Sequence, residues 1–332
     1  MRPRRACLAP LTFVTFALSV FLAAPLALAQ CDLRIGPAFP LPGVDDTVNA
    51  VAQWNDGSGN ALYVGGSFRT AGAIAADRIA KWNGSEWSSV GDGLSGTVCA
   101  LAVFNDGQGG GPALFAAGSF LTASGITVNR IAKWDGHAWS PLASGLTGGE
   151  VRCLAVFDDD AAGPNPPSLY AGGAFTHAGD LEVNHIARWD GSAWHDLDQG
   201  IGEDKVANVY ALEVFDQDGS GAILPALFAG ARFDSAGPIL ANNIAKWDGA
   251  SWSTLDSGVN GFVFSLKSFD RGTGTQLYVG GYFSYAGGST SDSIARWNGN
   301  TWQNVANGLY LQVTAMTVYD PDGSGISPPV LY

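Results

Sequence analysis

One short pattern recurs along the chain and constrains the fold more than any other feature. Ile-Ala-Lys/Arg-Trp-Asp/Asn-Gly occurs five times, at spacings of 52, 55, 58 and 50 residues. A second Trp follows the first Trp of each copy after five residues, so these pairs hold ten of the eleven Trp residues. Self-similarity at a period of roughly 50 residues indicates a repeat architecture. The copies begin at Ile79, Ile131, Ile186, Ile244 and Ile294.

Each repeat divides into four short apolar runs separated by turn chemistry. Asp/Asn-Gly follows the third run in every copy and predicts a tight hairpin to the fourth. Gly- and Asp-rich segments such as 55–59 and 270–274 predict a turn between the first two runs. Because the runs lack polar alternation, we expect both faces of each sheet to be covered. Four covered strands per repeat predict an all-β chain of stacked four-stranded sheets, as in a β-propeller.

The same residues resemble the kelch type of β-propeller repeat. A Gly-Gly doublet ends the second run, an aromatic residue before Asp ends the third, and Trp begins the fourth, from about Val48 to the end of the chain. The repeats are also similar to uncharacterised secreted bacterial tandem-repeat propeller proteins. The doublet is incomplete in two copies, and Trp stands where kelch repeats usually carry Tyr. The resemblance implies four-stranded kelch-like blades; it implies no activity, because such folds host binding modules and enzymes alike.

The first run occurs six times, whereas the Trp pair occurs five times. The sixth first run covers 313–319, and the terminal Leu331 and Tyr332 match the opening of a second run. We therefore expect five full repeats, a partial sixth and an incomplete chain. Residues 32–36 resemble a fourth run and could supply a strand that closes the last blade.

The first 29 residues read as a signal peptide. Three Arg residues precede a long apolar run, and small residues stand at the expected cleavage point before Gln30. A membrane anchor is the alternative, but Pro25 interrupts the run. Residues 28–31 loosely resemble a lipobox, in which Cys31 would carry a lipid. We predict residues 30–332 to be a propeller that is secreted or held at the cell surface or in the periplasm, with no transmembrane segment after cleavage.

Charge and composition exclude some classes of ligand and some classes of fold. The formal net charge is -13, so a nucleic acid is not an expected ligand. With 45 Gly and only 14% charged residues, the chain is neither a coiled coil nor a disordered tail. The segments where repeats differ, 161–168, 203–208 and 222–225, are the candidate binding loops, although neutral variation is the better explanation for any single one of them.

Two loops offer candidate metal ligands. Asp216, Asp218, Asp320 and Asp322 stand in Asp-x-Asp-Gly-Ser-Gly segments, which resemble the start of a calcium loop. Neither segment has the downstream acidic residue that completes such a loop. A plain hairpin turn is the competing interpretation. No other cofactor is expected.

No residue is assigned to catalysis. The four His are expected to be exposed turn residues, and Lys or Arg before each repeated Trp is expected to be scaffold, with a buried stem and a solvated or paired head. Cys99 and Cys153 differ by one register step, so we expect them to face opposite sides and to fill core. The candidate His are His137, His177, His185 and His195.

The sequence favours an exported, non-catalytic scaffold that binds an extracellular protein or a glycan. The alternative is a secreted polysaccharide-active hydrolase, lyase or oxidase with its site at the mouth of the channel, and a purely structural role is a third. Repeat-specific carboxylates or His around the axis would favour catalysis, whereas exposed aromatic residues would favour binding.

Overall fold

A computed structural model describes one compact unit, Leu41–Tyr332. The predicted signal peptide, Cys31, residues 32–36 and Asp322 lie outside the described residues. Every helix or strand assigned to the described residues is a β-strand. No helix long and apolar enough to cross a membrane occurs in that part of the chain. The described residues are 43–160, 163, 166–202, 207–219, 221, 223–305, 308–309, 311–320 and 328–332.

Each of the five repeats forms one four-stranded antiparallel sheet whose strands follow chain order. The first sheet contains β1 (Val48–Asn55), β2 (Asn60–Gly66), β5 (Ile79–Trp82) and β6 (Trp87–Ser89). The second contains β7 (Val98–Phe104), β8 (Ala113–Gly118), β11 (Ile131–Trp134) and β12 (Trp139–Pro141). The third contains β14 (Val151–Phe157), β15 (Ser168–Gly173), β18 (Ile186–Trp189) and β19 (Trp194–His195). The fourth contains β20 (Asn208–Phe215), β21 (Ala226–Arg232), β24 (Ile244–Trp247) and β25 (Trp252–Thr254). The fifth contains β26 (Phe262–Asp270), β27 (Thr275–Tyr282), β30 (Ile294–Trp297) and β31 (Trp302–Asn304).

Short two-residue strands complete the repeats. A small hairpin stands between the second and third long strands of every sheet, and a partial sixth copy contributes one more pair. These hairpins are an addition to the four predicted runs. They are β3 (Thr70–Ala71) with β4 (Ile74–Ala75), β9 (Thr122–Ala123) with β10 (Ile126–Thr127), β16 (His177–Ala178) with β17 (Leu181–Glu182), β22 (Ser235–Ala236) with β23 (Ile239–Leu240), and β28 (Tyr285–Ala286) with β29 (Ser289–Thr290). β13 (Leu146–Thr147), which precedes β14, pairs with β16 as a third strand. In the sixth copy, β32 (Val318–Tyr319) pairs with β33 (Val330–Leu331), at the places of its first two predicted runs.

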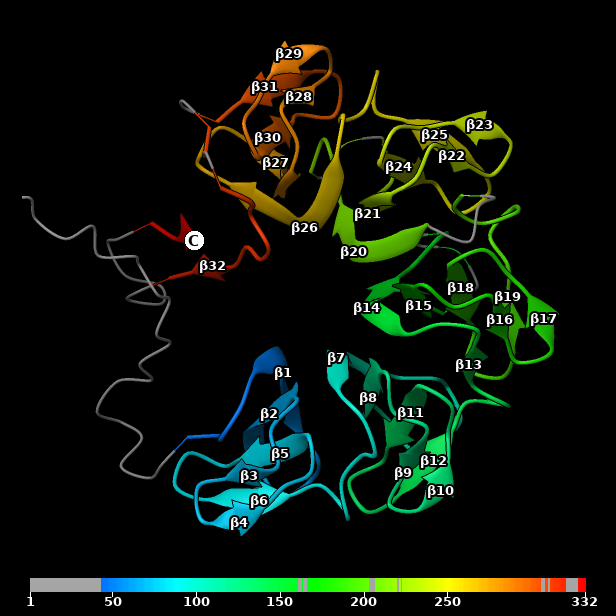
Figure 1. The fold of residues 1–332 in the computed structure, drawn as a ribbon, viewed down its shortest axis with the longest axis vertical. Helices are drawn as coiled ribbons and strands as arrows, with labels where there is room; N and C mark the ends of the chain where they lie inside the picture. The colour runs from blue at the N-terminus through cyan, green and yellow to red at the C-terminus, as the bar shows by residue number, and fades with distance from the viewer. Residues whose placement is uncertain are drawn as a thin grey trace, which may run out of the picture. The chain divides into compact units, whose positions relative to one another are not determined.

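Consecutive sheets lie side by side, and the first strand of each packs beside the first strand of the next, from β1 through β7, β14 and β20 to β26 (Figure 1). The hydrophobic core lies between neighbouring sheets, since each core cluster draws its side chains from two of them. One sheet alone would leave half of that core in water. This explains why the long strands lack polar alternation.

The first residue of the Gly doublet permits this close packing. A Cβ on Gly65 would lie only 2.5 Å from Cγ1 of Val98 in the next sheet. The same contact recurs between Gly230 and Val263, where the next sheet again presents Val. The small residues are therefore required by the approach of one sheet to its neighbour.

The repeated Trp residues join the sheets through hydrogen bonds as well as packing. The indole Nε1 of Trp139 donates to the carbonyl oxygen of Val90 in the preceding sheet, at 3.2 Å. Trp194, Trp252 and Trp302 make the same bond to Leu142, Leu197 and Leu255. Trp87 occupies the corresponding place in the first sheet, and its Nε1 is buried with no hydrogen-bond partner among the described residues.

Candidate functional site

A β-bulge follows the opening Val of every first strand and creates the pocket described below. In β1 the register shifts between Val48 and Ala50, so Asn49 has no partner in the ladder. The second Gly of the doublet packs against this point, where a Cβ on Gly66 would collide with the carbonyl oxygen of Thr47. The bulge thereby frees one side chain per repeat from the sheet. The five bulge residues are Asn49, Cys99, Arg152, Tyr210 and Phe264.

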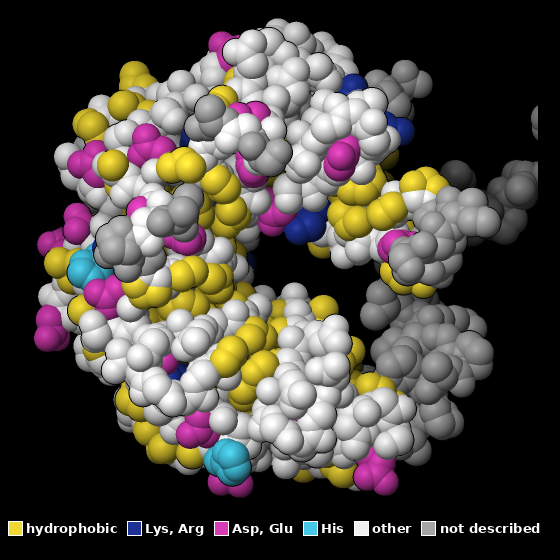
Figure 2. Space-filling view, turned by 180° about the vertical axis from the view of Figure 1, so that it is seen from behind, with side chains coloured by type: hydrophobic (Ala, Val, Ile, Leu, Met, Phe, Trp, Pro, Cys, Tyr) yellow, Lys and Arg dark blue, Asp and Glu magenta, His cyan; other side chains and the backbone are white. Residues whose placement is uncertain are grey.

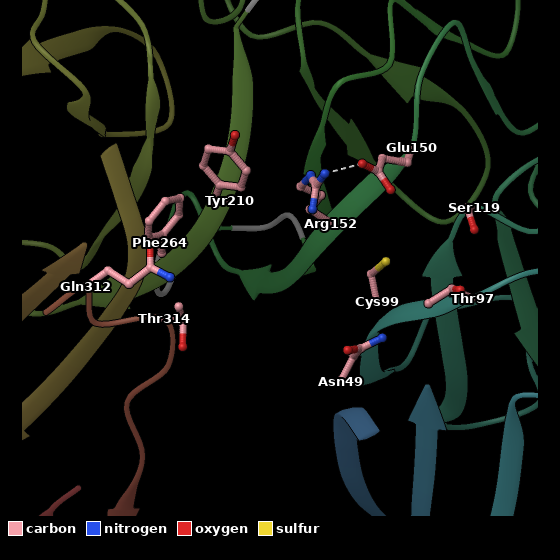
Figure 3. Close-up of a pocket in the computed structure, with 10 residues that line it drawn as sticks. All are labelled: Asn49, Thr97, Cys99, Ser119, Glu150, Arg152, Tyr210, Phe264, Gln312 and Thr314. Carbon is pink, nitrogen blue, oxygen red and sulfur yellow. Dashed lines mark hydrogen bonds and ion pairs between the residues drawn. The ribbon is translucent and has the colours of Figure 1, made fainter. Parts of the chain in front are cut away.

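These five side chains line a single pocket of about 520 Å³, hereafter the bulge pocket. Thr314, which also follows the opening Val of its copy, lines it too. Figure 3 shows Tyr210 and Phe264 on one side of the pocket and Asn49 and Cys99 on the other. Its volume falls within the roughly 300–1,000 Å³ typical of small-molecule sites. The remaining lining residues are Thr97, Ser119, Glu150 and Gln312.

Arg152 links the polar and aromatic parts of the bulge pocket. Its guanidinium forms an ion pair with Glu150 (Figure 3) and lies 5.2 Å from the centre of the Tyr210 ring. The Tyr210 ring meets Phe264 edge-on at 5.2 Å, and Phe264 stacks on Phe262 at 5.6 Å. Such contacts hold the aromatic wall in place and leave the paired charges about one-third exposed, at 35% each.

The opposite wall carries small polar groups. The amide nitrogen of Asn49 donates to the carbonyl oxygen of Val98 at 2.9 Å, which fixes the amide at the wall. Burial raises the pKa of the Cys99 thiol, and the Glu150 carboxylate adds to this effect while Arg152 opposes it. The thiol is therefore protonated at neutral pH and is a poor nucleophile.

The lining chemistry suits binding better than hydrolysis. Among the ten lining residues, Glu150 is the one carboxylate, and it is already paired with Arg152. Glycoside hydrolysis usually relies on two carboxylates across the scissile bond. An aromatic wall facing amide, hydroxyl and guanidinium groups can instead stack on the apolar face of a ligand and hydrogen-bond to its rim.

The structure describes three of the four predicted calcium ligands, which belong to two separate loops. Asp216 and Asp218 lie in the β20–β21 loop, whereas Asp320 follows β32, and Asp322 is outside the described residues. The Asp216 carboxylate accepts the main-chain N–H of Asp218 at 3.2 Å, and Asp218 accepts that of Ile223 at 3.0 Å. The first bond is that of an ordinary Asx turn, and the second holds the loop five residues further on. Calcium binding remains a prediction.

A third acidic loop could also hold a cation. Carboxylate oxygens of Asp158, Asp159 and Asp160 lie within 4.8 Å of one another in the β14–β15 loop. Asp159 already accepts a hydrogen bond from Arg188 at 2.6 Å, so one of the three carboxylates is committed to an ion pair.

Two expectations about single residues are corrected. His185 is not an exposed turn residue: it is buried, with a φ of 65° directly before β18. His137 and His177 are exposed, and His195 is half-buried against Asp190 at 2.6 Å. Cys99 does not fill core but lines the bulge pocket.

The bulge interrupts the strand alternation that was used to place the two cysteines on opposite faces. Cys153 pairs with Gly172 in the ladder, whereas Cys99 is a bulge residue, and both thiols are free. Cys153 packs against the core between the third and fourth sheets. The predicted surface loops 161–168, 203–208 and 222–225 lie partly outside the described residues.

Sequence reasoning missed the bulge pocket, although a signal was present. The residue after the opening Val is different in all six copies, whereas the Val itself never changes. Variation at one position inside an otherwise constant strand indicates a side chain that the scaffold does not need. The bulge turns this side chain toward the pocket, but a bulge inside a run of apolar residues has no sequence signal by which it could be predicted.

Comparisons with known proteins place the chain in no family. No family model matches it. A stretch of 126 residues, 37% of the chain, is 26% identical to the polarized growth protein L1 of Phoma sp., and it spans only 9% of that protein. The designed protein Ika8 has a TM-score of 0.37 at 15% identity, over 84% of this chain and 93% of its own. The extracellular domain of a hybrid two-component system from B. thetaiotaomicron has a TM-score of 0.31 at 12% identity, over 85% of this chain and 38% of its own.

Proposed function

We propose that this chain is an exported β-propeller whose four-stranded sheets are kelch-like blades. The adjacency of the first strands and the location of the core between sheets support this arrangement. Export rests on residues 1–29 alone, whose sequence is that of a signal peptide. An acidic surface, visible in Figure 2 as scattered Asp and Glu with few basic side chains, agrees with a partner other than a nucleic acid.

The proposed activity is binding, without catalysis, of an extracellular glycan or protein at the bulge pocket. One observation carries this proposal: a position that differs in every repeat supplies side chains from all five sheets to a single pocket. The scaffold does not need these side chains, so they are available to contact a ligand. The aromatic wall is formed by the half-buried Tyr210 and Phe264, which line the pocket and can stack on a ligand.

Binding can be tested by calorimetry with the mature protein and a panel of soluble oligosaccharides and extracellular proteins. Phe264→Ala should remove the stacking surface and weaken binding at least tenfold. Leu240→Ala is the matched control, because Leu240 is 83% exposed, is not among the residues that line the bulge pocket and should leave affinity unchanged.

Two results would contradict the proposal. Equal losses in both variants would place the ligand elsewhere on the protein. Release of shorter sugars from a bound polysaccharide, followed by chromatography, would favour the polysaccharide-active enzyme instead.

A further inference from the structure

Each of the first three sheets contains an ion pair at the end where its first and second long strands are joined, as β1 and β2 are in the first sheet. The second residue of that loop is Asp, and its carboxylate accepts a hydrogen bond from Lys or Arg on the third long strand. The pairs are Asp56 with Lys81, Asp106 with Lys133, and Asp159 with Arg188, at 2.5, 2.5 and 2.6 Å. The Lys or Arg before each repeated Trp was expected to have a solvated or paired head, and in these three sheets it is paired.

Where the second strand offers Tyr beside this cation, the hydroxyl donates to the same carboxylate. Tyr63 donates to Asp56 at 2.7 Å, and Tyr170 donates to Asp159 at 3.1 Å. The Asp is therefore the common acceptor for a buried phenol and a cation. Without it, both donors would lose their partner, which is costly in a buried place.

The fifth sheet keeps the donors but has lost the acceptor. Its loop has the same geometry as that of the first sheet: Asp270 pairs with Thr275 as Asn55 pairs with Asn60, and both Asx side chains accept main-chain N–H groups of their own turn. The next residue, which is Asp56 in the first sheet, is Arg271 in the fifth.

The consequence is a group of unsatisfied donors. Tyr278 lies opposite Arg296 in the ladder, as Tyr63 lies opposite Lys81. Tyr278 is only 2% exposed, and both its hydroxyl and the Nε of Arg296 are buried with no hydrogen-bond partner among the described residues. Two guanidinium groups and a phenol therefore belong to a place where the first three sheets hold a carboxylate.

Space for a ligand is present beside these donors. Tyr278 and Arg271 line a pocket of about 740 Å³, together with Asp270 and apolar residues that include Ile294 and Val305. The carboxylate of Asp270 is occupied by the N–H groups of its own turn, the nearest at 2.7 Å. It is therefore not the missing acceptor.

We propose that this pocket binds a carboxylate ligand, which replaces the missing Asp as acceptor for the two donor residues that line the pocket, Tyr278 and Arg271. Guanidinium groups bind carboxylates through two parallel hydrogen bonds, and each such charge-assisted bond is stronger than a neutral one. The first and third sheets show that a phenol and a cation in this setting are satisfied by a carboxylate. The site is separate from the bulge pocket and does not depend on the proposed function.

The probe is sodium acetate at pH 7, compared with sodium chloride at equal ionic strength, and the readout is the midpoint of thermal unfolding of the mature chain. Acetate should raise the midpoint in a saturable manner. At ten times the dissociation constant, the folding equilibrium constant should increase roughly elevenfold. Glucuronate and glucose form two further arms: a larger shift with glucuronate than with acetate identifies an acidic sugar as ligand, an equal shift identifies a bare carboxylate, and glucose should have no effect.

Arg271→Asp supplies the carboxylate from within the chain. It should raise the midpoint without acetate and abolish the response to acetate. Gln217→Asp is the matched control, because it restores Asp at the equivalent place in the fourth sheet, where Phe228 stands instead of Tyr. That variant should retain the full acetate response.

Tyr278→Phe keeps the ring and removes the hydroxyl, so it should weaken the acetate response even if Arg271→Asp fails to fold. The proposal is overturned if acetate raises the midpoint of the wild-type protein no more than chloride does. It is equally overturned if the acetate response survives intact in both Arg271→Asp and Tyr278→Phe.

Discussion

One position in the loop between the first two long strands stabilises some repeats and, by our proposal, receives a ligand in the fifth. Asp56 is the clearest case of the stabilising use. Burial acts to raise its pKa, but hydrogen bonds from Lys81, Ser58 and Tyr63 outweigh this effect and hold the pKa well below its usual value. The carboxylate is thus more acidic in the folded chain than in the unfolded chain.

Asp56→Asn should therefore destabilise the protein in a pH-dependent manner. At pH 7 the loss should be about 1–3 kcal/mol, because Lys81 and Tyr63 lose a charged acceptor. A lowered pKa adds stability above the unfolded value of about 3.9, and this contribution is lost as the pH falls below it. Urea unfolding at pH 7, 5 and 3 should show the difference from wild type shrinking at pH 3.

Asp92→Asn serves as control for that series, since Asp92 is exposed. A loss for Asp56→Asn that stays constant from pH 7 to pH 3 would contradict the assigned role of the ion pair.

Cys99 allows a second measurement at the scale of one residue. The Glu150 carboxylate contributes to the raised pKa of the Cys99 thiol, so Glu150→Gln should lower that pKa and increase the thiolate fraction. We expect iodoacetamide to modify Cys99 several-fold faster in the variant at pH 8, as measured by mass spectrometry of the peptide. Cys153, whose pKa is raised by burial, is the internal control and should remain slow. Unchanged Cys99 kinetics would show that Glu150 does not act on the thiol.

At the scale of strands, the sequence predicted most of what the structure shows. The four strands of each sheet and the hairpin after each third strand were predicted, because apolar runs and Asx-Gly turns both report on local backbone geometry. The two-residue hairpins such as β3–β4 were missed because two residues carry no periodicity. The bulges and the burial of His185 were missed for a different reason: both depend on contacts with segments distant in sequence.

The Trp bonds between sheets give a prediction at the same scale. Trp139→Phe and Trp87→Phe remove a similar amount of buried indole surface, but only Trp139 donates to a carbonyl, that of Val90. Trp139→Phe should therefore cost about 1 kcal/mol more than Trp87→Phe, the net value of one hydrogen bond. Denaturant unfolding of the two variants measures this difference. Equal costs would mean that Trp87 finds an acceptor outside the described residues.

For the whole molecule, stability depends on neighbours because the core lies between sheets. The inner sheets are covered on both faces by their neighbours in the chain, whereas the first sheet has no preceding sheet among the described residues. The effect is visible in β1, where Val48 is 38% exposed, while its counterpart Val151 in β14 is 0% exposed. The end of the array should thus open more readily than its middle.

Native-state hydrogen exchange tests this directly. Amides of β1 should exchange faster than those of β14, because fewer apolar contacts must be broken to open the first sheet. The comparison is internal to one protein sample, so pH and temperature affect both strands alike. Equal protection would instead show that another segment covers β1. Deleting residues 30–36, whose sequence predicts a strand that closes the last repeat, tests one such segment. If that segment supports the sixth copy against β1, the deletion should raise exchange in β1 and leave β14 unchanged, whereas equal exchange in both strands before and after the deletion would exclude it.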